Sequence, residues 1–139
     1  MLRPGGLVVP IEVDLSVMRW LPEYPLGTQI KSWLVEAFAR AGLTMLGPRL
    51  WAIAREAGLR PLGMIGIQPH FGAGDEDGLA FLVEGMRVAE SLIVGTGVAT
   101  AEEIGIDTLE QRLRDAGEKT RGVGAAYMLL SAWATTGPA

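Results

Sequence analysis

The stretch Ala125-Ala126-Tyr127-Met128-Leu129-Leu130-Ser131-Ala132-Trp133-Ala134 is the segment on which the prediction of the fold depends. It carries no charge, Gly122 and Gly124 introduce it, and a polar tail follows it. An uncharged apolar segment between glycines and a polar tail predicts a last β-strand from Ala125 to Ala134.

Two further apolar segments predict strands earlier in the chain. Leu7 to Val13 is rich in β-branched residues and follows a Pro-Gly-Gly turn. Pro10 lies within this segment and has no N–H to donate, so the strand is either bulged there or unpaired on one side. Leu62 to Phe71 is apolar on both faces, and Pro69 indicates that its pairing stops near its end.

Helices are expected between the first two strands. A loop runs from Asp14 to Gly27, and Thr28 is the expected N-cap of a helix that ends at Gly42. Gly47-Pro48 begins the next helix, since proline suits the first helical position, and Gly58 ends it.

The interval before the last strand also predicts helices. An acidic loop leads into a long helix with an apolar stripe from Leu79 to Ile93. Thr100 with Glu103, and Asp107 with Glu110, have the spacing of a capping box and predict a broken pair of helices. Because helices separate the strands, this order favours a three-layer α/β fold over a bundle or a sandwich.

The length and hydropathy set the class of protein. A chain of 139 residues, 49% of them hydrophobic, fits a single domain over residues 1–139. The N-terminus lacks the apolar stretch of a signal peptide, and the uncharged segment 122–139 is too short in its apolar part to span a bilayer. We therefore expect a soluble cytoplasmic protein with no membrane partner.

The composition excludes several kinds of chemistry. Without cysteine there is no disulfide, Fe–S cluster, Cys-bound zinc or thiol nucleophile. The single histidine, His70, makes a His-based metal site or a Ser-His-Asp triad hard to build within one subunit. Twelve basic residues against sixteen acidic ones, a net charge of −4, argue against nucleic acid as a partner.

Three motifs in order resemble one family. Leu2-Arg3-Pro4-Gly5-Gly6, followed at once by an apolar strand, resembles the turn before the fifth strand of class I S-adenosylmethionine-dependent methyltransferases. The stretch from Gly47 to Leu59 is similar to the family's helix before its sixth strand, which ends in Glu-Ala-Gly. The stretch from Tyr127 to Gly137 resembles the family's final antiparallel strand.

The resemblance implies the C-terminal half of a Rossmann-like methyltransferase sheet. This is a three-stranded mixed sheet flanked by helices, with the last strand antiparallel and inserted between the other two. A complete member has an earlier half, whose glycine-rich loop and following acid bind S-adenosylmethionine. In these 139 residues Gly72-Ala73-Gly74 and Gly95-Thr96-Gly97 are better interpreted as turns, so we expect no cofactor binding by this chain alone.

The resemblance also implies a substrate site. In that family the pocket lies over the carboxyl ends of the strands, as α/β sheets generally favour. This points to Asp14, Arg19, Trp20 and Tyr24, with Asp14 orienting or deprotonating the acceptor and the exposed-looking aromatics walling an apolar substrate. His70 is a further candidate, because imidazole is a ready base at neutral pH. The structural alternatives are a turn cap for Asp14, sheet-edge cover for the aromatics and a surface position for His70.

Two functions follow from these observations. The first is methyl transfer to an O, N or C nucleophile of a small molecule, with activity dependent on the other half. The second is a non-catalytic remnant that dimerises or binds a ligand. In a complete member of the family, the strand from Leu7 to Val13 would pair with the family's fourth strand. These 139 residues lack that strand, so the outer edge of Leu7 to Val13 is expected to be open. The expected partner is therefore a second copy or a separate N-terminal half, whether the chain is mis-started, truncated or split.

Overall fold

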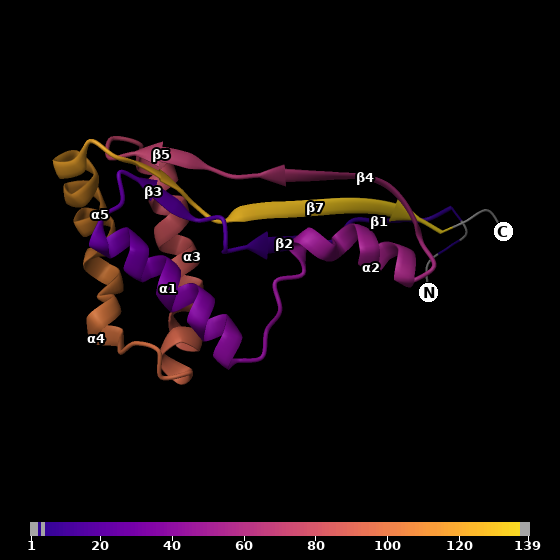
Figure 1. Ribbon diagram of the computed structural model, residues 1–139, viewed down its shortest axis with the longest axis horizontal. Helices are drawn as coiled ribbons and strands as arrows, with labels where there is room; N and C mark the ends of the chain where they lie inside the picture. The colour runs from indigo at the N-terminus through magenta and orange to yellow at the C-terminus, as the bar shows by residue number, and fades with distance from the viewer. Residues whose placement is uncertain (1–2, 4, 137–139) are drawn as a thin grey trace. The chain divides into compact units, whose positions relative to one another are not determined.

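The computed structural model of the chain describes residues 3 and 5–136. Met1, Leu2 and Pro4 of the expected N-terminal turn, and Gly137 of the closing motif, lie outside the described residues. Helices and strands alternate along the chain (Figure 1), so the predicted α/β class is confirmed. Among the described residues, no helix combines the length and the apolar character needed to cross a membrane.

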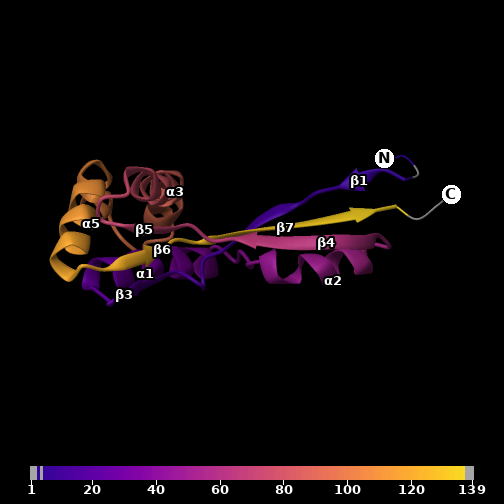
Figure 2. The ribbon, with the colours of Figure 1, turned by 90° about the horizontal axis from the view of Figure 1, so that it is seen from above.

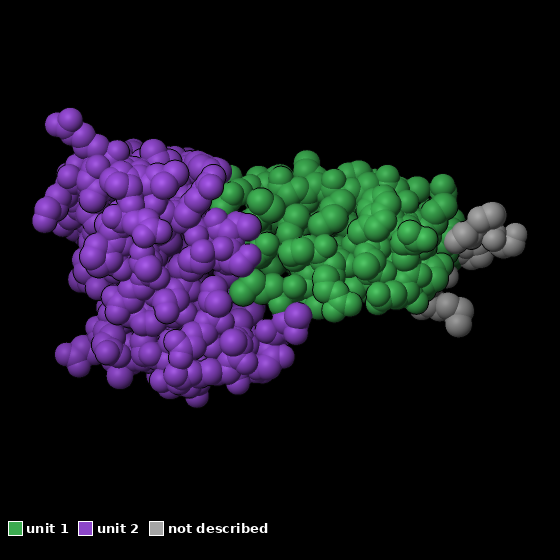
Figure 3. All heavy atoms as spheres, in the orientation of Figure 1, with its two compact units in different colours: residues 1–14, 45–68, 128–139 green, residues 15–44, 69–127 purple. Residues whose placement is uncertain are grey.

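The chain forms two compact units, and each is assembled from separate segments (Figure 3). Unit 1 comprises residues 1–14, 45–68 and 128–139. Unit 2 comprises residues 15–44 and 69–127. The chain therefore leaves unit 1 after its first strand, returns, leaves again after its second strand, and returns with its last.

The last strand is the centre of the sheet in unit 1. β7 (Met128–Thr135) pairs along one edge with β1 (Leu7–Val8) and β2 (Ile11–Asp14), and along the other with β4 (Arg60–Ile67). The prediction that the last strand lies between the other two and runs antiparallel to both is confirmed. The expected mixed sheet is not found, because β7 separates β2 from β4 and every pair of neighbouring strands in the described part of the chain is antiparallel.

Pro10 interrupts the first strand without shifting its register. Leu7 lies opposite Thr135 and Ile11 lies opposite Ser131, so no extra residue is accommodated between β1 and β2. The Pro10 carbonyl still accepts hydrogen bonds from the Ala132 N–H at 3.3 Å and from the Ser131 hydroxyl at 3.2 Å. The bulge that was one of two expectations is therefore absent, and the strand continues on both sides of the proline.

One face of this sheet carries the helical layer of unit 1. Gly47 and Pro48 begin a 3-10 turn, η1 (Gly47–Arg49), which continues as α2 (Leu50–Glu56) and packs against β4 and β7 (Figure 2). The core of this layer consists of Leu50, Leu130, Ala132, Met64 and Met128. Within unit 1 the described helices cover this face alone, so the sheet has two layers instead of the expected three.

Unit 2 contains a second sheet that the sequence did not predict. Its central strand is β6 (Val123–Ala125), which pairs antiparallel with β3 (Arg19–Leu21) and β5 (His70–Gly72). β3 lies within the expected loop. Two expected strands are each divided between the two sheets, the second at Gln68-Pro69 and the last at Ala126-Tyr127. The Pro69 carbonyl accepts a hydrogen bond from the Ala126 N–H at 3.0 Å, so the two divided segments contact each other close to the points where they are divided.

Unit 2 also contains four helices. They are α1 (Pro25–Arg40), α3 (Glu76–Gly95), α4 (Ala101–Ile104) and α5 (Ile106–Thr120). Their fully buried side chains form the core of unit 2, among them Ile30, Leu79, Leu82, Met86, Ile93, Leu109 and Leu113. The apolar stripe predicted from Leu79 to Ile93 is therefore confirmed as the inner side of α3.

Two of the three predicted helix caps were wrong. Tyr24, not Thr28, is the N-cap of α1, because Pro25 occupies the first helical position and the Thr28 N–H already bonds to the Tyr24 carbonyl at 3.2 Å. The capping box of Thr100 with Glu103 is confirmed at α4. The box predicted at Asp107 is absent, since Gly105 takes a positive φ of 54° and starts α5 before it.

Gly27 allows the first turn of α1 to lie against Trp20. A Cβ atom on Gly27 would lie 2.4 Å from Cδ2 of the Trp20 ring, and this ring is 2% exposed. We expect Gly27→Ala to lower the free energy of unfolding by about 1–3 kcal/mol through overpacking. In the matched control, Gly74→Ala, the new methyl meets no atom within 4 Å, and urea titration should show a change within about 0.5 kcal/mol. Equal stability of the two variants would contradict this packing.

Candidate functional site

The small sheet of unit 2 sorts the candidate residues onto two faces. Trp20 lies opposite Gly124 on β6, and Phe71 lies on the other side of Gly124, so these residues share one face. Arg19 and His70 flank Ala125 in the next row, and alternation along a strand turns them toward the opposite face. Trp20 is buried with the core, whereas Arg19 and His70 are exposed.

The absence of a side chain at Gly124 brings two aromatic rings together. A Cβ atom there would lie 2.7 Å from Cζ of Phe71 and 3.0 Å from Nε1 of Trp20. Nε1 of Trp20 is buried and has no hydrogen-bond partner among the described residues. An unpaired buried N–H has a desolvation cost of about 1–3 kcal/mol.

Tyr24 extends this aromatic group toward the surface. Its ring meets Trp20 edge to face, with 6.0 Å between ring centroids, and the side chain is 7% exposed. Burial raises the pKa of the Tyr24 hydroxyl to about 12. The phenol therefore keeps its proton at neutral pH, so it can donate a hydrogen bond to a ligand but does not act as a base.

Two hollows adjoin along the first turns of α1, and we call them together the α1 groove. One has a volume of about 660 Å³, and its walls include Tyr24, Trp33, Glu36 and Val98. The other has a volume of about 350 Å³, and its walls include Arg19, Trp20, Lys31 and Val35. Glu23, Thr28 and Ser32 belong to both. The groove is open to solvent along the exposed side of the helix.

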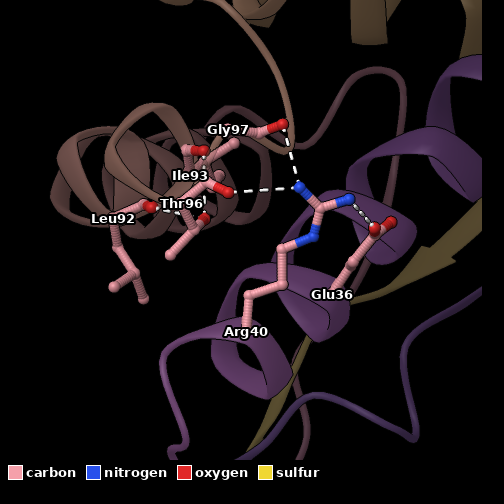
Figure 4. Close-up of polar contacts among 6 residues, drawn as sticks. All are labelled: Glu36, Arg40, Leu92, Ile93, Thr96 and Gly97. Atoms are coloured by element: carbon pink, nitrogen blue, oxygen red, sulfur yellow. Dashed lines mark hydrogen bonds and ion pairs between the residues drawn. The ribbon is translucent and has the colours of Figure 1, made fainter.

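Arg40 fixes one wall of the α1 groove (Figure 4). Its Nη1 donates to the carbonyls of Thr96 and Gly97 at 3.1 and 3.0 Å, and its Nη2 pairs with the Glu36 carboxylate. These carbonyls end α3, where a cation is favoured by the helix dipole. One guanidinium thus links α1 to the segment that carries Val98 and also orients Glu36.

The charges along the groove are separated. Arg19 and Lys31 line the smaller hollow, whereas Glu36 lines the larger one and Glu23 lies between them. Arg19, Lys31 and Glu23 form no ion pair or side-chain hydrogen bond within the described part of the chain. Arg19, Lys31 and Glu23 are therefore available to a small molecule without the loss of an internal ion pair, whereas Glu36 is paired with Arg40.

The structure brings together three of the five predicted site residues. Arg19, Trp20 and Tyr24 line the α1 groove. His70 lies across β6 from Arg19 and does not line the described hollows of this groove. Asp14 belongs to unit 1, where it ends β2 opposite Met128 and is buried. The aromatics expected to be exposed are buried, because the unpredicted β3 draws Trp20 into the core.

Most residues that line the groove were not predicted as site residues. Among them, Lys31, Trp33 and Glu36 lie on α1. Glu36 pairs with Arg40 and also lines the larger hollow. The available signal was a helix directly after the predicted substrate loop, since its first exposed turns necessarily lie beside that loop. Over residues 3 and 5–136, no cluster of three or more histidine or acidic side chains is arranged to hold a metal ion.

We expect Arg40→Ala to destabilise unit 2 by about 1 kcal/mol, because two carbonyls at the end of α3 lose a charged donor. Arg87→Ala is the matched control. Arg87 is equally exposed but bonds only to the side chains of Glu84 and Asp107, so its removal should change stability by less than about 0.5 kcal/mol. Urea unfolding of both variants measures this difference, and equal losses would show that the link through Arg40 contributes nothing.

Alkaline pH should destabilise the chain through Tyr24. The unfolded pKa of tyrosine is about 10, and burial raises the folded pKa of Tyr24 to about 12. The stabilisation due to the neutral phenol is complete below pH 10 and is lost as the pH rises toward 12. In Tyr24→Phe the unfolding midpoint in urea should therefore fall less between pH 9 and pH 11.5. Burial also raises the pKa of Tyr127, so Tyr127→Phe measures the second contribution.

Sequence comparison adds no relative from which a function is transferred. No protein-family model matches the chain, and no curated protein matches its sequence. The function is therefore inferred from the strand order of unit 1 and from the residues of the α1 groove.

Proposed function

We propose that the chain is the substrate-side half of an S-adenosylmethionine-dependent methyltransferase that acts on a small molecule. The observation that supports this most directly is the position of β7 between β2 and β4, antiparallel to both. The family resemblance implies this order, whereas the local sequence pattern implies only the number of strands. A Rossmann-like sheet would continue from the outer edge of β2, which has no partner strand among the described residues.

The chain connections support a substrate role for unit 2. Its two segments, 15–44 and 69–127, follow the carboxyl ends of β2 and β4. In α/β sheets, ligands bind beyond the carboxyl ends of strands that share a direction. The segments inserted at these two points are therefore the expected source of substrate contacts, and the α1 groove lies on the first of them.

Residues of this chain do not fit the cofactor itself. The turn at Gly72-Ala73-Gly74 connects β5 to α3, but β5 pairs antiparallel with β6, and the Asp75 carboxylate accepts the Gly78 N–H at 3.0 Å. The Gly78 N–H at this helix N-terminus is thus bonded to a side chain of the protein and is not available to a cofactor. We assign the S-adenosylmethionine site to a separate glycine-rich half, which is the partner this proposal requires.

The contribution of this chain to catalysis would be positioning. Methyl transfer from a sulfonium needs an acceptor held in line with the methyl group, and correct placement supplies much of the rate enhancement. In the α1 groove, Tyr24 and Trp33 offer aromatic walls, the neutral Tyr24 hydroxyl donates a hydrogen bond, and Arg19, Lys31 and Glu23 orient charged or polar substituents. A small, partly apolar molecule with polar substituents matches this lining.

Calorimetric titration with S-adenosylmethionine tests the proposal. The purified 139-residue chain should give no heat of binding, because the glycine-rich loop belongs to the other half. The same chain joined to a glycine-rich half encoded upstream in the same reading frame should bind in the micromolar range. Micromolar binding by the chain alone would contradict the assignment of the cofactor site, and no binding by the joined protein would contradict the proposed family.

A further inference from the structure

The sheet of unit 1 has one covered face and one open face. Cross-strand partners lie on the same face of a sheet, so Leu130, Ala132 and Met64 mark the side that packs on α2. The intervening residues face the other way, where unit 1 has no helix in the part of the chain that the structure describes (Figure 2). We call this side the open face. Its exposed apolar side chains are Leu7, Ile11, Ile65 and Ile67. Leu129, Ser131 and Trp133 are residues of β7 on this face, and Arg60, opposite Thr135, lies at one end of it.

The open face is apolar across all three strands. Ile11 and Ile65 flank Ser131 in one row, and their side chains are 65% and 50% exposed. Ile67, opposite Leu129 in the next row, is 58% exposed. Isolated exposed apolar side chains are ordinary, but a contiguous patch of this kind marks an interaction site.

Two hydroxyl groups of the open face form hydrogen bonds within unit 1. The Ser131 hydroxyl donates to the Pro10 carbonyl at 3.2 Å, and the Thr135 hydroxyl donates to the Gly6 carbonyl at 3.1 Å. At the centre, the Trp133 ring occupies the space in which Gly63 would carry a Cβ, which would lie 2.1 Å from Cζ2. The rows from Gly63 to Ile67 contain no charged side chain. The central rows of this face therefore bring no charged side chain into an interface, and Arg60 lies at one end of it.

We infer that the open face binds the open face of a second copy of this chain, so that two sheets stack as in a sandwich. Because the centre of the face lacks charge, two copies meet there without like-charge repulsion, and a two-fold axis brings identical apolar surfaces together. Stacked sheets lie about 10 Å apart, close enough for their side chains to interdigitate.

The size of the open face suits such an interface. Three strands about 4.8 Å apart, each about eight residues long at about 3.3 Å per residue, give a face of roughly 14 by 26 Å. Side-chain relief increases the accessible area above this flat footprint. Stacking two copies then removes on the order of 1,000 Å² in total from water, the size at which specific interfaces begin.

Light scattering after size-exclusion chromatography tests this inference. The purified chain at tens of micromolar should have about twice its monomer mass of 14.8 kDa. Ile65→Glu places a carboxylate in the centre of the interface, and it should raise the dimer dissociation constant by about a hundredfold or more and give a monomer. Ile11→Glu, on another strand of the same face, should do the same. Circular dichroism checks that each variant stays folded, which the exposure of both side chains favours.

The matched control is Val88→Glu on α3, where an equally apolar side chain is 82% exposed but belongs to unit 2. This variant should remain dimeric. A monomeric wild-type chain at 100 micromolar would overturn the inference, as would a folded Ile65→Glu that stays dimeric or a Val88→Glu that dissociates equally. Dimers that survive Ile65→Glu would instead indicate pairing through the strand edges. None of these outcomes depends on S-adenosylmethionine, so the proposed function is tested separately.

Discussion

The hydrogen bonding of β7 along both of its edges is the constraint on which the rest of the structure depends. Three segments far apart in the sequence, β1 with β2, β4 and β7, become one sheet only through this strand. β2 and β4 share a direction and do not pair with each other. Among the described strands, backbone hydrogen bonds therefore join them only through β7. The helix α2 adds a packed layer on one side, but its core residue Leu50 packs against Leu130 and Ala132 of β7 itself.

The chain passes from one sheet to the other at Gln68-Pro69 and again at Ala126-Tyr127. It pairs with different partners on either side of each point. Proline has no N–H for the ladder, so Pro69 ends the pairing of β4 and leaves its carbonyl to the Ala126 N–H. One apolar stretch in the sequence thus contributes a strand to each of two compact units.

The sequence pattern predicted those helices and strands whose physical cause lies within a few neighbouring residues. The apolar stretch of β7, the proline-initiated helix at Gly47 and the capping box at Thr100 each have their physical cause within a few residues. The sheet of unit 2 has no such signal, because its strands are three residues long and β3 pairs with β6 about a hundred residues away. The same distance explains the site: Trp20 lies opposite Gly124, whose missing side chain leaves room for its ring, and no residue near Trp20 in the sequence predicts this neighbour. Arg19, Trp20 and Tyr24 were found together because they follow one strand closely.

The interleaving of the two units has a consequence for how the chain is made. Leu7 is paired with Thr135, far along the sequence. Within the described part of the chain, β1 and β2 gain their partner strand only when β7 has been synthesised. Unit 2 completes its own sheet only with β6, shortly before. Such non-local pairing slows folding and prolongs exposure of apolar segments. Among the described strands, the sheet of unit 1 thus cannot assemble in chain order, because its first strands pair with β7 alone.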